Sequence, residues 1–390
     1  MRSAWTAAAG CAAALWAASP AAGASPAPRH RAFWDVSLGP VRSTNVYRDS
    51  SEEADTGYDL RARVGLRSRF SPRTFAQLHY DLDALSFRTA NVENRRDHAF
   101  AGLVRHRLRD PLTLEVKAGL RLSRFPNVTA FDSTTTYGQG ALKGYLTTRT
   151  TLEGGLAYEA TSYPDYDLDN HSVGVFGTLA RDFGRRTFGE LSMAFRSEGY
   201  SERLLRDPTS TETPDDPRRR DHDWFAGARV VRDFSLVLQL EAAYQYGRLS
   251  SNGDSLDFGP FQSALADVPG DERLVSDFYS HRRHEIRARL RRLIRRGSSV
   301  TLAARFQDRA YFGRLARDAN EQFLSPEEKR HDRAILVSAT VDVPIPVLAR
   351  HARFGHFGLR LRLAREMNQS NEALYDYGST VAALSFTSWF

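Results

Sequence analysis

The segment from Tyr58 to Phe70 alternates apolar with charged side chains, and this alternation constrains the fold more than any other feature of the chain. Tyr58, Leu60, Ala62, Val64, Leu66 and Phe70 form one series, and Asp59, Arg61, Arg63, Arg67 and Arg69 form the other. A strand sorts two such series onto opposite faces, whereas a helix would scatter the arginines around its surface. The segment therefore predicts a strand with one apolar face and one basic face.

The same two-residue period recurs along the chain and predicts sixteen strands. The expected ranges are 31–46, 58–70, 74–87, 98–108, 112–125, 136–147, 151–163, 171–181, 186–200, 221–232, 235–249, 278–294, 298–311, 331–343, 353–367 and 374–390. The sixth and fourteenth have the weakest alternation, so fourteen or eighteen strands stay open. Short turns follow the even strands from the second to the twelfth, and longer loops follow the odd ones.

This layout is typical of one class of all-β protein. An even number of strands with alternating short and long connections predicts a transmembrane antiparallel up-and-down β-barrel over residues 25–390. The mean hydropathy of -0.47 agrees, because only every second residue of such a strand meets lipid. No stretch approaches 18 consecutive apolar residues, as a membrane helix would require. The alternative is a soluble all-β protein, but a propeller would show a repeat of roughly 40 residues.

The first 24 residues have the features of a secretory signal peptide. Arg2 supplies the charged start, residues 7–18 supply the apolar run, and Ala22-Gly23-Ala24 fits a cleavage site. The rival interpretation is lipid attachment at Cys11. Because Cys11 is the only cysteine, cleavage after Ala24 would leave an exported chain that has no disulfides.

The C-terminal strand carries a recognisable pattern of its own. Leu384, Phe386 and Phe390 fall on one face, and the chain ends on the aromatic residue. This end resembles the assembly signal of outer-membrane β-barrels from Gram-negative bacteria, although Ser388 stands where that family usually has an apolar residue. The resemblance implies the barrel-assembly machinery as a partner. It also implies location in the outer membrane, among its lipids and lipopolysaccharide.

The polar faces of the strands would then line the barrel interior, and their charges are uneven. A basic wall is predicted from Arg61, Arg63, Arg67, Arg69, Arg283, Arg287, Arg289, Arg291, Arg305, Arg360 and Arg362, and an acidic wall from Asp81, Asp83, Glu153, Glu159, Glu190 and Glu241. Opposed walls of charge would favour anions or polar solutes in a water-filled pore. The alternative is that acids and arginines form salt-bridged ladders that stiffen the wall. We therefore expect a passive pore for small polar or anionic solutes.

Two further resemblances bear on function. The strand count resembles that of general trimeric porins, whose third outer loop folds inward as a constriction. Here the third outer loop, 126–135, is short, so a constriction is expected from 201–220 and 250–277. Asn368-Gln369-Ser370-Asn371 followed by Tyr375-Asp376-Tyr377 resembles barrels of the surface-lipoprotein assembly modifier type. That resemblance makes export or assembly of surface molecules the alternative function.

Catalysis is the least favoured function. His171 with Ser172, His222 with Asp221 and Asp223, and His281 with Ser280 are the candidate pairs for an outer-membrane lipid hydrolase, but none has a distinctive spacing. The sequence has no calcium-loop, phosphate-loop or metal-cluster pattern, so we expect no enzyme activity, cofactor or metal. The formal charge is +7, and the arginines alternate with apolar residues along strands. That arrangement does not favour a nucleic-acid partner, and the oligomeric state stays open.

Overall fold

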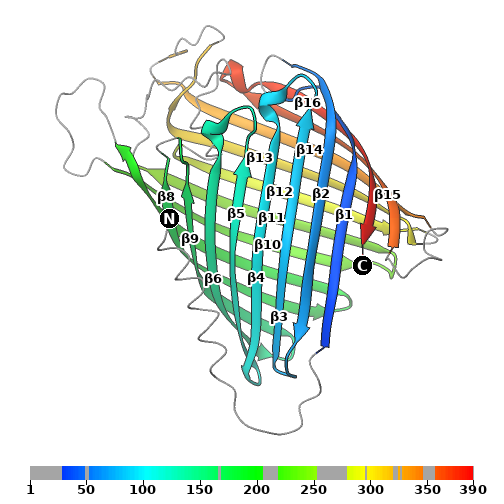
Figure 1. The fold of residues 1–390 in the computed structure, drawn as a ribbon. Coiled ribbons are helices and arrows are strands. Elements are labelled where there is room, and N and C mark those ends of the chain that lie inside the picture. Colours follow the sequence, from blue (N-terminus) through cyan, green and yellow to red (C-terminus); the bar gives the residue numbers. More distant parts are fainter. Residues whose placement is uncertain are drawn as a thin grey trace.

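The protein is a closed barrel of sixteen antiparallel strands (Figure 1). The computed structural model describes residues 29–48, 52–165, 168–204, 218–252, 279–294, 297–318, 324–325, 327–345 and 356–389. The strands are β1 (Arg29–Ser43), β2 (Asp55–Arg69), β3 (Thr74–Phe87), β4 (Arg95–Arg109), β5 (Leu112–Arg124), β6 (Ser133–Thr147), β7 (Thr150–Ser162), β8 (Asn170–Gly184), β9 (Thr187–Leu204), β10 (Arg218–Asp233), β11 (Leu238–Ser251), β12 (His281–Leu293), β13 (Ser299–Leu315), β14 (Lys329–Pro344), β15 (His356–Ser370) and β16 (Tyr377–Trp389). The predicted fold class and the count of sixteen are confirmed.

Several strands are longer at the loop end than the alternation predicts. β9 continues to Leu204 and β13 to Leu315, whereas β16 begins only at Tyr377. A 3-10 turn, η5 (Ala373–Tyr375), precedes β16; the other two such turns of the described chain are η1 (Asn91–Glu93) and η2 (Thr129–Phe131). At the loop ends of these strands the backbone still pairs with the neighbouring strand. The side chains there do not alternate between apolar and polar, so the sequence pattern does not predict the extra residues. The predicted signal peptide lies outside the described residues.

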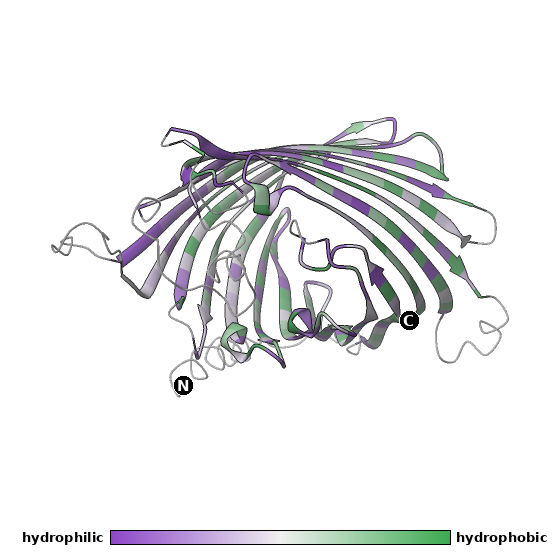
Figure 2. Ribbon diagram, turned by 90° about the horizontal axis from the view of Figure 1, so that it is seen from above, coloured by the Kyte–Doolittle hydropathy of each residue, from purple (hydrophilic) through white to green (hydrophobic). Residues whose placement is uncertain are grey.

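The apolar series forms the outer surface of the barrel. Figure 2 shows hydrophobic and hydrophilic residues alternating along the strands. Leu78, Leu156, Leu191 and Met193 are 58–66% exposed, and each lies on the same face as the apolar side chains opposite it on the neighbouring strands. A continuous outward belt of this kind suits contact with lipid hydrocarbon. Within the described part of the chain, no helix has the length and hydropathy needed to cross a membrane.

The barrel closes by pairing its first and last strands, which lie side by side in Figure 1. Leu38 of β1 stands opposite Phe386 of β16, and both side chains are about half exposed on the outer face. The indole Nε1 of Trp34 donates a hydrogen bond to Oγ of Ser388 at 3.2 Å. Ser388 thus has a bonding partner across the closing pair, which accounts for a polar side chain at that position. Phe390 lies outside the described residues.

The charged face of the sheet, on the other side from the apolar outer surface, is partly covered by outer loops. This identifies the charged face as the interior of the barrel. In the first outer loop, 44–54, Val46 and Tyr47 pack against buried Val41 and Phe87, whose side chains point inward from β1 and β3. From the same loop, Nε of Arg48 lies 3.7 Å from Oε2 of Glu366 on β15. Because a barrel of this size has no central core, such clusters supply the buried contacts at its loop end.

Candidate functional site

The candidate site is the inner surface of the barrel. All predicted wall residues lie on one side of the sheet, because the pairing register places each opposite other members of the inward series. For example, Arg63 stands opposite Asp81, whereas the next residue, Val64, stands opposite Tyr80. The sequence thus identified the shared face, but the register decides which charges are neighbours.

On β12 and β13, arginines stand directly opposite arginines. Arg287 pairs in register with Arg305, and Arg283 pairs with Arg309. Side chains directly opposite each other are about 5 Å apart at Cβ, and like charges in that position are destabilising. Nε of Arg305 is buried and has no hydrogen-bond partner. The inner face of β12 and β13 therefore carries a concentration of positive charge at a cost in stability.

Two further arginines extend this positive strip along β12. Arg289 and Arg291 are exposed, and no carboxylate among the described residues lies within ion-pair distance of either guanidinium. Arg287 itself pairs with Glu285 on its own strand. We call Arg283, Arg287, Arg289, Arg291 and Arg305 the arginine strip.

The remaining part of the predicted basic wall is largely paired. Arg63 makes a bidentate contact with Asp81, with its Nε 2.6 Å and its Nη2 3.0 Å from the two carboxylate oxygens. Arg61 lies between Asp59 and Asp83, at 3.0 and 3.8 Å. On the other side of the closure, Nε of Arg360 is 2.6 Å from Asp342. Strands β2–β3 and β14–β15 therefore form the salt-bridged ladders that were the alternative interpretation.

Three basic-wall residues on β2 and β15 have no carboxylate partner in these ladders. The guanidinium of Arg67 lies 4.3 Å from the ring centre of Phe33, and its Nε donates to Gln77. For Arg69 and Arg362, the described residues include no carboxylate within ion-pair distance. These arginines lie on β2 and β15, the same strands that carry the ladders.

The predicted acidic wall is mostly neutralised. Arg229 of β10 lies between Glu241, at 2.7 Å, and Glu190, at 3.9 Å. Glu153 lies 3.7 Å from Lys143. These basic partners, together with Arg105 and Lys117 on β4 and β5, stand on the same wall as the acids. The two walls are thus more mixed than the sequence suggested, and the arginine strip stands out as the region with excess charge.

A recess of about 450 Å³ hollows the inner wall between β6 and β12. Small residues such as Ala157 and Gly174 form its floor, and Glu159, Asp223 and Arg283 contribute charges to its lining. Of these charged residues, only Arg283 belongs to the arginine strip, at its outer end. The recess therefore gives the interior a region where both signs of charge meet.

Aromatic rings lie flat over glycines along this wall. The ring of Phe176 occupies the place where a Cβ on Gly155 would stand, and the ring of Tyr137 lies likewise over Gly119. Such a ring fills the gap that glycine leaves in a strand and stays close to the barrel wall.

Gly155→Ala is expected to lower the free energy of unfolding by about 1–3 kcal/mol, because the methyl group overlaps the Phe176 ring and a backbone carbonyl. Gly140 on β6 provides the matched control, since a Cβ there meets nothing within 4 Å. Urea unfolding of the refolded barrels in one detergent measures both. Equal midpoints for Gly155→Ala and Gly140→Ala would contradict the packing.

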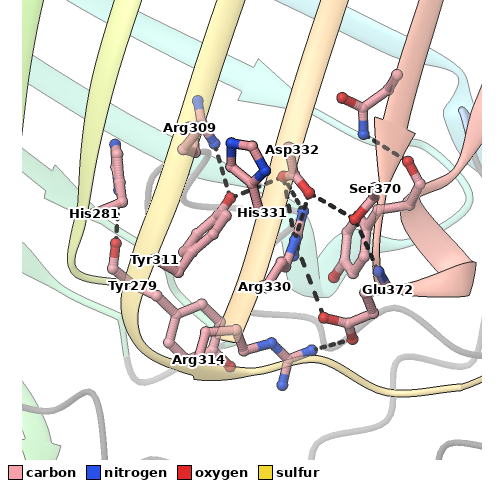
Figure 3. A network of polar contacts seen from close by, with 12 residues as sticks. Tyr279, His281, Arg309, Tyr311, Arg314, Arg330, His331, Asp332, Ser370 and Glu372 are labelled. Carbon is pink, nitrogen blue, oxygen red and sulfur yellow. Dashed lines mark hydrogen bonds and ion pairs between the residues drawn. The ribbon is translucent and has the colours of Figure 1, made fainter. Parts of the chain in front are cut away.

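A buried network of arginines, carboxylates and tyrosines closes over the inner wall at the outer mouth (Figure 3). We call it the mouth network; its members are Tyr200, Arg219, Asp221, Tyr279, Tyr311, Arg314, Arg330, Asp332, Ser370, Glu372 and Tyr375. Arg219, Arg314 and Arg330 are only 0–6% exposed. Nη2 of Arg314 donates to Glu372 at 2.8 Å, and Nη2 of Arg330 donates to Asp332 at 2.8 Å.

Each buried arginine also stacks on a tyrosine. Arg330 lies 3.3 Å from the ring centre of Tyr375 and 4.8 Å from that of Tyr311. Cation–π contacts are strongest where the cation is desolvated, as here. The network therefore fixes the eighth outer loop, 371–376, to the ends of β13 and β14.

The fourth outer loop, 163–169, joins the same region. Leu168 is fully buried against Tyr200, Tyr279 and Tyr311, which come from β9, from the segment before β12 and from β13. Burial raises the pKa of Tyr163 to about 12, and nearby Glu198 adds to the rise. The Tyr163 hydroxyl therefore stays neutral, and the mouth is lined by uncharged phenols beside its ion pairs.

Sequence reasoning missed the mouth network. Arg219 and Asp221, like Arg330 and Asp332, are two residues apart, and this spacing puts each pair on one face of a strand. That spacing was the available signal. The expected constriction loops, 201–220 and 250–277, lie mostly outside the described residues. Among the described loop residues, those of the first, fourth and eighth outer loops make the contacts over the interior given above.

The candidate catalytic pairs are not assembled into a site. His171 and Ser172, adjacent on β8, point to opposite faces, as do His222 and its neighbours Asp221 and Asp223 on β10. His281 is buried and its Nδ1 contacts the Tyr279 carbonyl oxygen, while Ser280 accepts a hydrogen bond from Ser251. Across the described ranges, no group of three His, Cys, Asp or Glu side chains could hold a metal ion.

Comparison with known proteins supports the fold. No protein-family model and no curated protein matches the chain in sequence. The anion-selective porin from Comamonas acidovorans superposes with a TM-score of 0.52 at 10% identity, over 93% of this chain and 100% of that one. OmpT, an outer membrane protein of Vibrio cholerae, gives 0.48 at 8% identity, over 94% and 98%. Pseudomonas aeruginosa OpdL gives 0.46 at 11% identity, over 93% and 99%.

The similarity to the porin from Comamonas acidovorans is a similarity of fold. The chain is a closed sixteen-strand barrel, and it shares this fold with the anion-selective porin. This confirms the fold expected from the C-terminal pattern and the strand count.

Proposed function

We propose that the protein is a passive pore in the outer membrane of a Gram-negative bacterium and that it favours small anionic or polar solutes. The arginine strip carries the proposal. On the inner face Arg287 stands opposite Arg305, and among the described residues no carboxylate lies within ion-pair distance of Arg289 or Arg291. These guanidinium groups create a positive potential in the interior. Arginines along a water-filled wall attract anions. The anions keep most of their hydration shell, so a bound solute can leave again.

The paired residues support the same function in a different way. In ladders such as Arg63–Asp81, the positive and negative charges neutralise each other. The net positive potential of the interior then comes mainly from the arginine strip. The mouth network holds the eighth outer loop against the ends of β13 and β14 (Figure 3). A solute would therefore enter beside the ordered mouth and meet the arginine strip deeper in the barrel.

Recording from single barrels in planar lipid bilayers tests the proposal. We expect discrete conductance steps. Across a potassium chloride gradient, we expect a reversal potential that has the sign of the chloride equilibrium potential. Barrels that are shown to be folded by their heat-modifiable migration on gels but give no conductance steps would refute the pore. In that event, loss of a surface protein on deletion would support the export or assembly alternative, and release of fatty acid from phospholipid would support a hydrolase.

We also propose that Leu384, Phe386 and Phe390 are read by the barrel-assembly machinery. Deletion of Phe390 is expected to reduce the amount of folded barrel in the outer membrane several-fold, because the last strand would lack its terminal aromatic residue. Leu361→Ala on β15, which removes an apolar outward side chain outside these three positions, is the matched control. Membrane fractionation with heat-modifiability measures both, and normal insertion of the truncated chain would exclude Phe390 from the signal.

A further inference from the structure

Two arginines interrupt the apolar outer surface at the barrel closure. Arg365 on β15 stands in register between Val337 of β14 and Thr380 of β16, on the face of outward Leu363 and Met367. Arg42 on β1 stands opposite Ala382 of β16, on the same face. Both arginines are exposed. Each belongs to a face that is otherwise apolar over most of the strand, with Val36 and Leu38 on β1 and Leu361 and Leu363 on β15.

Within the described parts of the chain, neither arginine forms an ion pair. Nη1 of Arg365 donates to Oγ1 of Thr380 at 3.2 Å, a neutral acceptor. Among the residues that the structure describes, no carboxylate lies within ion-pair distance of Arg365 or Arg42. A charge on the lipid-facing side of a barrel costs about 2–4 kcal/mol at the midplane and less near the interfaces, so it is retained where it has a partner to bind.

The two guanidinium groups flank a low strip of small residues. β16 runs between β15 and β1, and its outward residues at this level are Gly378, Thr380 and Ala382. Two strand spacings amount to about 10 Å, which two arginine side chains can span from either side. Thr44 belongs to the same strip, since its Oγ1 accepts a hydrogen bond from the Thr380 amide at 2.9 Å. The geometry is a shallow polar cradle with a cation on each side.

The position of the cradle identifies the class of ligand. Arg42 immediately precedes the end of β1, and Arg365 lies in the loop-end half of β15, so the cradle is near the outer loops. Towards the opposite end, the same strands present Leu361, Leu384 and Phe386, which are 43–52% exposed. A ligand that fits this surface has anionic groups at the level of the two arginines and several acyl chains at the level of Leu361, Leu384 and Phe386. Arginine matches phosphate oxygens with two parallel hydrogen bonds.

We propose that Arg42 and Arg365 bind phosphate groups of lipopolysaccharide, the phosphorylated glycolipid of the outer leaflet, at the β15–β16–β1 surface. The proposal rests on the outer-membrane location in the proposed function but not on pore activity. Lipid bound there would cover the strand pair that closes the barrel. Ala382 would lie beneath the headgroup.

Native mass spectrometry of the full-length refolded barrel with purified rough lipopolysaccharide tests the proposal. The double variant Arg42→Gln/Arg365→Gln is expected to lower the affinity about tenfold or more, as loss of two charge-assisted contacts implies. Ala382→Phe keeps both charges but fills the strip, and it is expected to weaken binding as well. Arg289→Gln/Arg291→Gln removes the same charge from the inner face and should leave lipid binding unchanged.

Two other ligands identify the occupant. Dephosphorylated glycolipid is expected to bind no better to the native barrel than to the double variant, and phosphatidylglycerol should bind more weakly than lipopolysaccharide. Equal lipopolysaccharide binding by native barrel and double variant would overturn the proposal, and equal binding of phosphatidylglycerol would overturn the choice of glycolipid. The conductance of the double variant, recorded in phospholipid bilayers, should match that of the native barrel. Loss of lipopolysaccharide binding and loss of pore activity are therefore measured independently.

Discussion

Arg289→Glu/Arg291→Glu is expected to reduce the ratio of anion to cation permeability about tenfold, because clefts lined by one sign of charge concentrate counter-ions by that factor or more. Both side chains are exposed on the inner face of β12. Arg289 stands opposite Glu241 of β11, but among the described residues no carboxylate lies within ion-pair distance of either guanidinium. Their replacement therefore changes the interior field by four charges without breaking an ion pair. The reversal potential in a potassium chloride gradient measures the change.

Arg292→Glu provides the matched control for this result. Arg292 follows Arg291 on β12 but points to the outer face, with Val300 opposite it on β13. A charge change there is separated from the interior by the barrel wall, so the permeability ratio should stay within about twofold, a shift of roughly 0.4 kcal/mol. Equal shifts from the inner and outer variants would show that the arginine strip does not set selectivity. A low-salt recording sharpens the contrast, because salt screens the field.

Arg330→Ala is expected to lower the free energy of unfolding by about 3–5 kcal/mol, because it removes the arginine that pairs with the buried carboxylate of Asp332. Nη2 of Arg330 lies 2.8 Å from Asp332, and its Nε lies 4.0 Å from Glu372, which is itself only 2% exposed. The stacking of Arg330 on Tyr375 is lost as well. The eighth outer loop should then detach from β14. Urea unfolding of the refolded barrel measures the stability, and limited proteolysis measures the loop.

Arg333→Ala tests whether burial is the cause. Arg333 lies three residues along the same strand and pairs with Asp308 at 3.3 Å, but 60% of its side chain is exposed. Exposed pairs contribute at most about 1 kcal/mol, so this variant should unfold near the native midpoint. Matching losses from Arg330→Ala and Arg333→Ala would show that the mouth network is not a stabilising unit. Unchanged proteolysis of the eighth loop in Arg330→Ala would contradict its anchoring role.

The sequence predicted the barrel because alternation is a local signal repeated in every strand. The series from Tyr58 to Phe70 was enough to separate an outer from an inner face, and the same period placed all sixteen strands. Strand ends were less accurate, as at β9 and β16, because polar residues can pair their backbones without any alternation. Ser388 seemed a departure in the sequence, but its hydrogen bond with Trp34 forms only when β1 meets β16.

The sequence by itself determined which residues share the inner face, and therefore which arginines and acids line the interior. Only the tertiary structure decided which of them are neighbours. Arg63 meets Asp81, whereas Arg287 meets Arg305, because the register of each strand pair fixes its contacts. The mouth network and the cradle of Arg42 and Arg365 likewise join residues far apart in the chain. Such contacts depend on loop packing and barrel closure, and no local period encodes them.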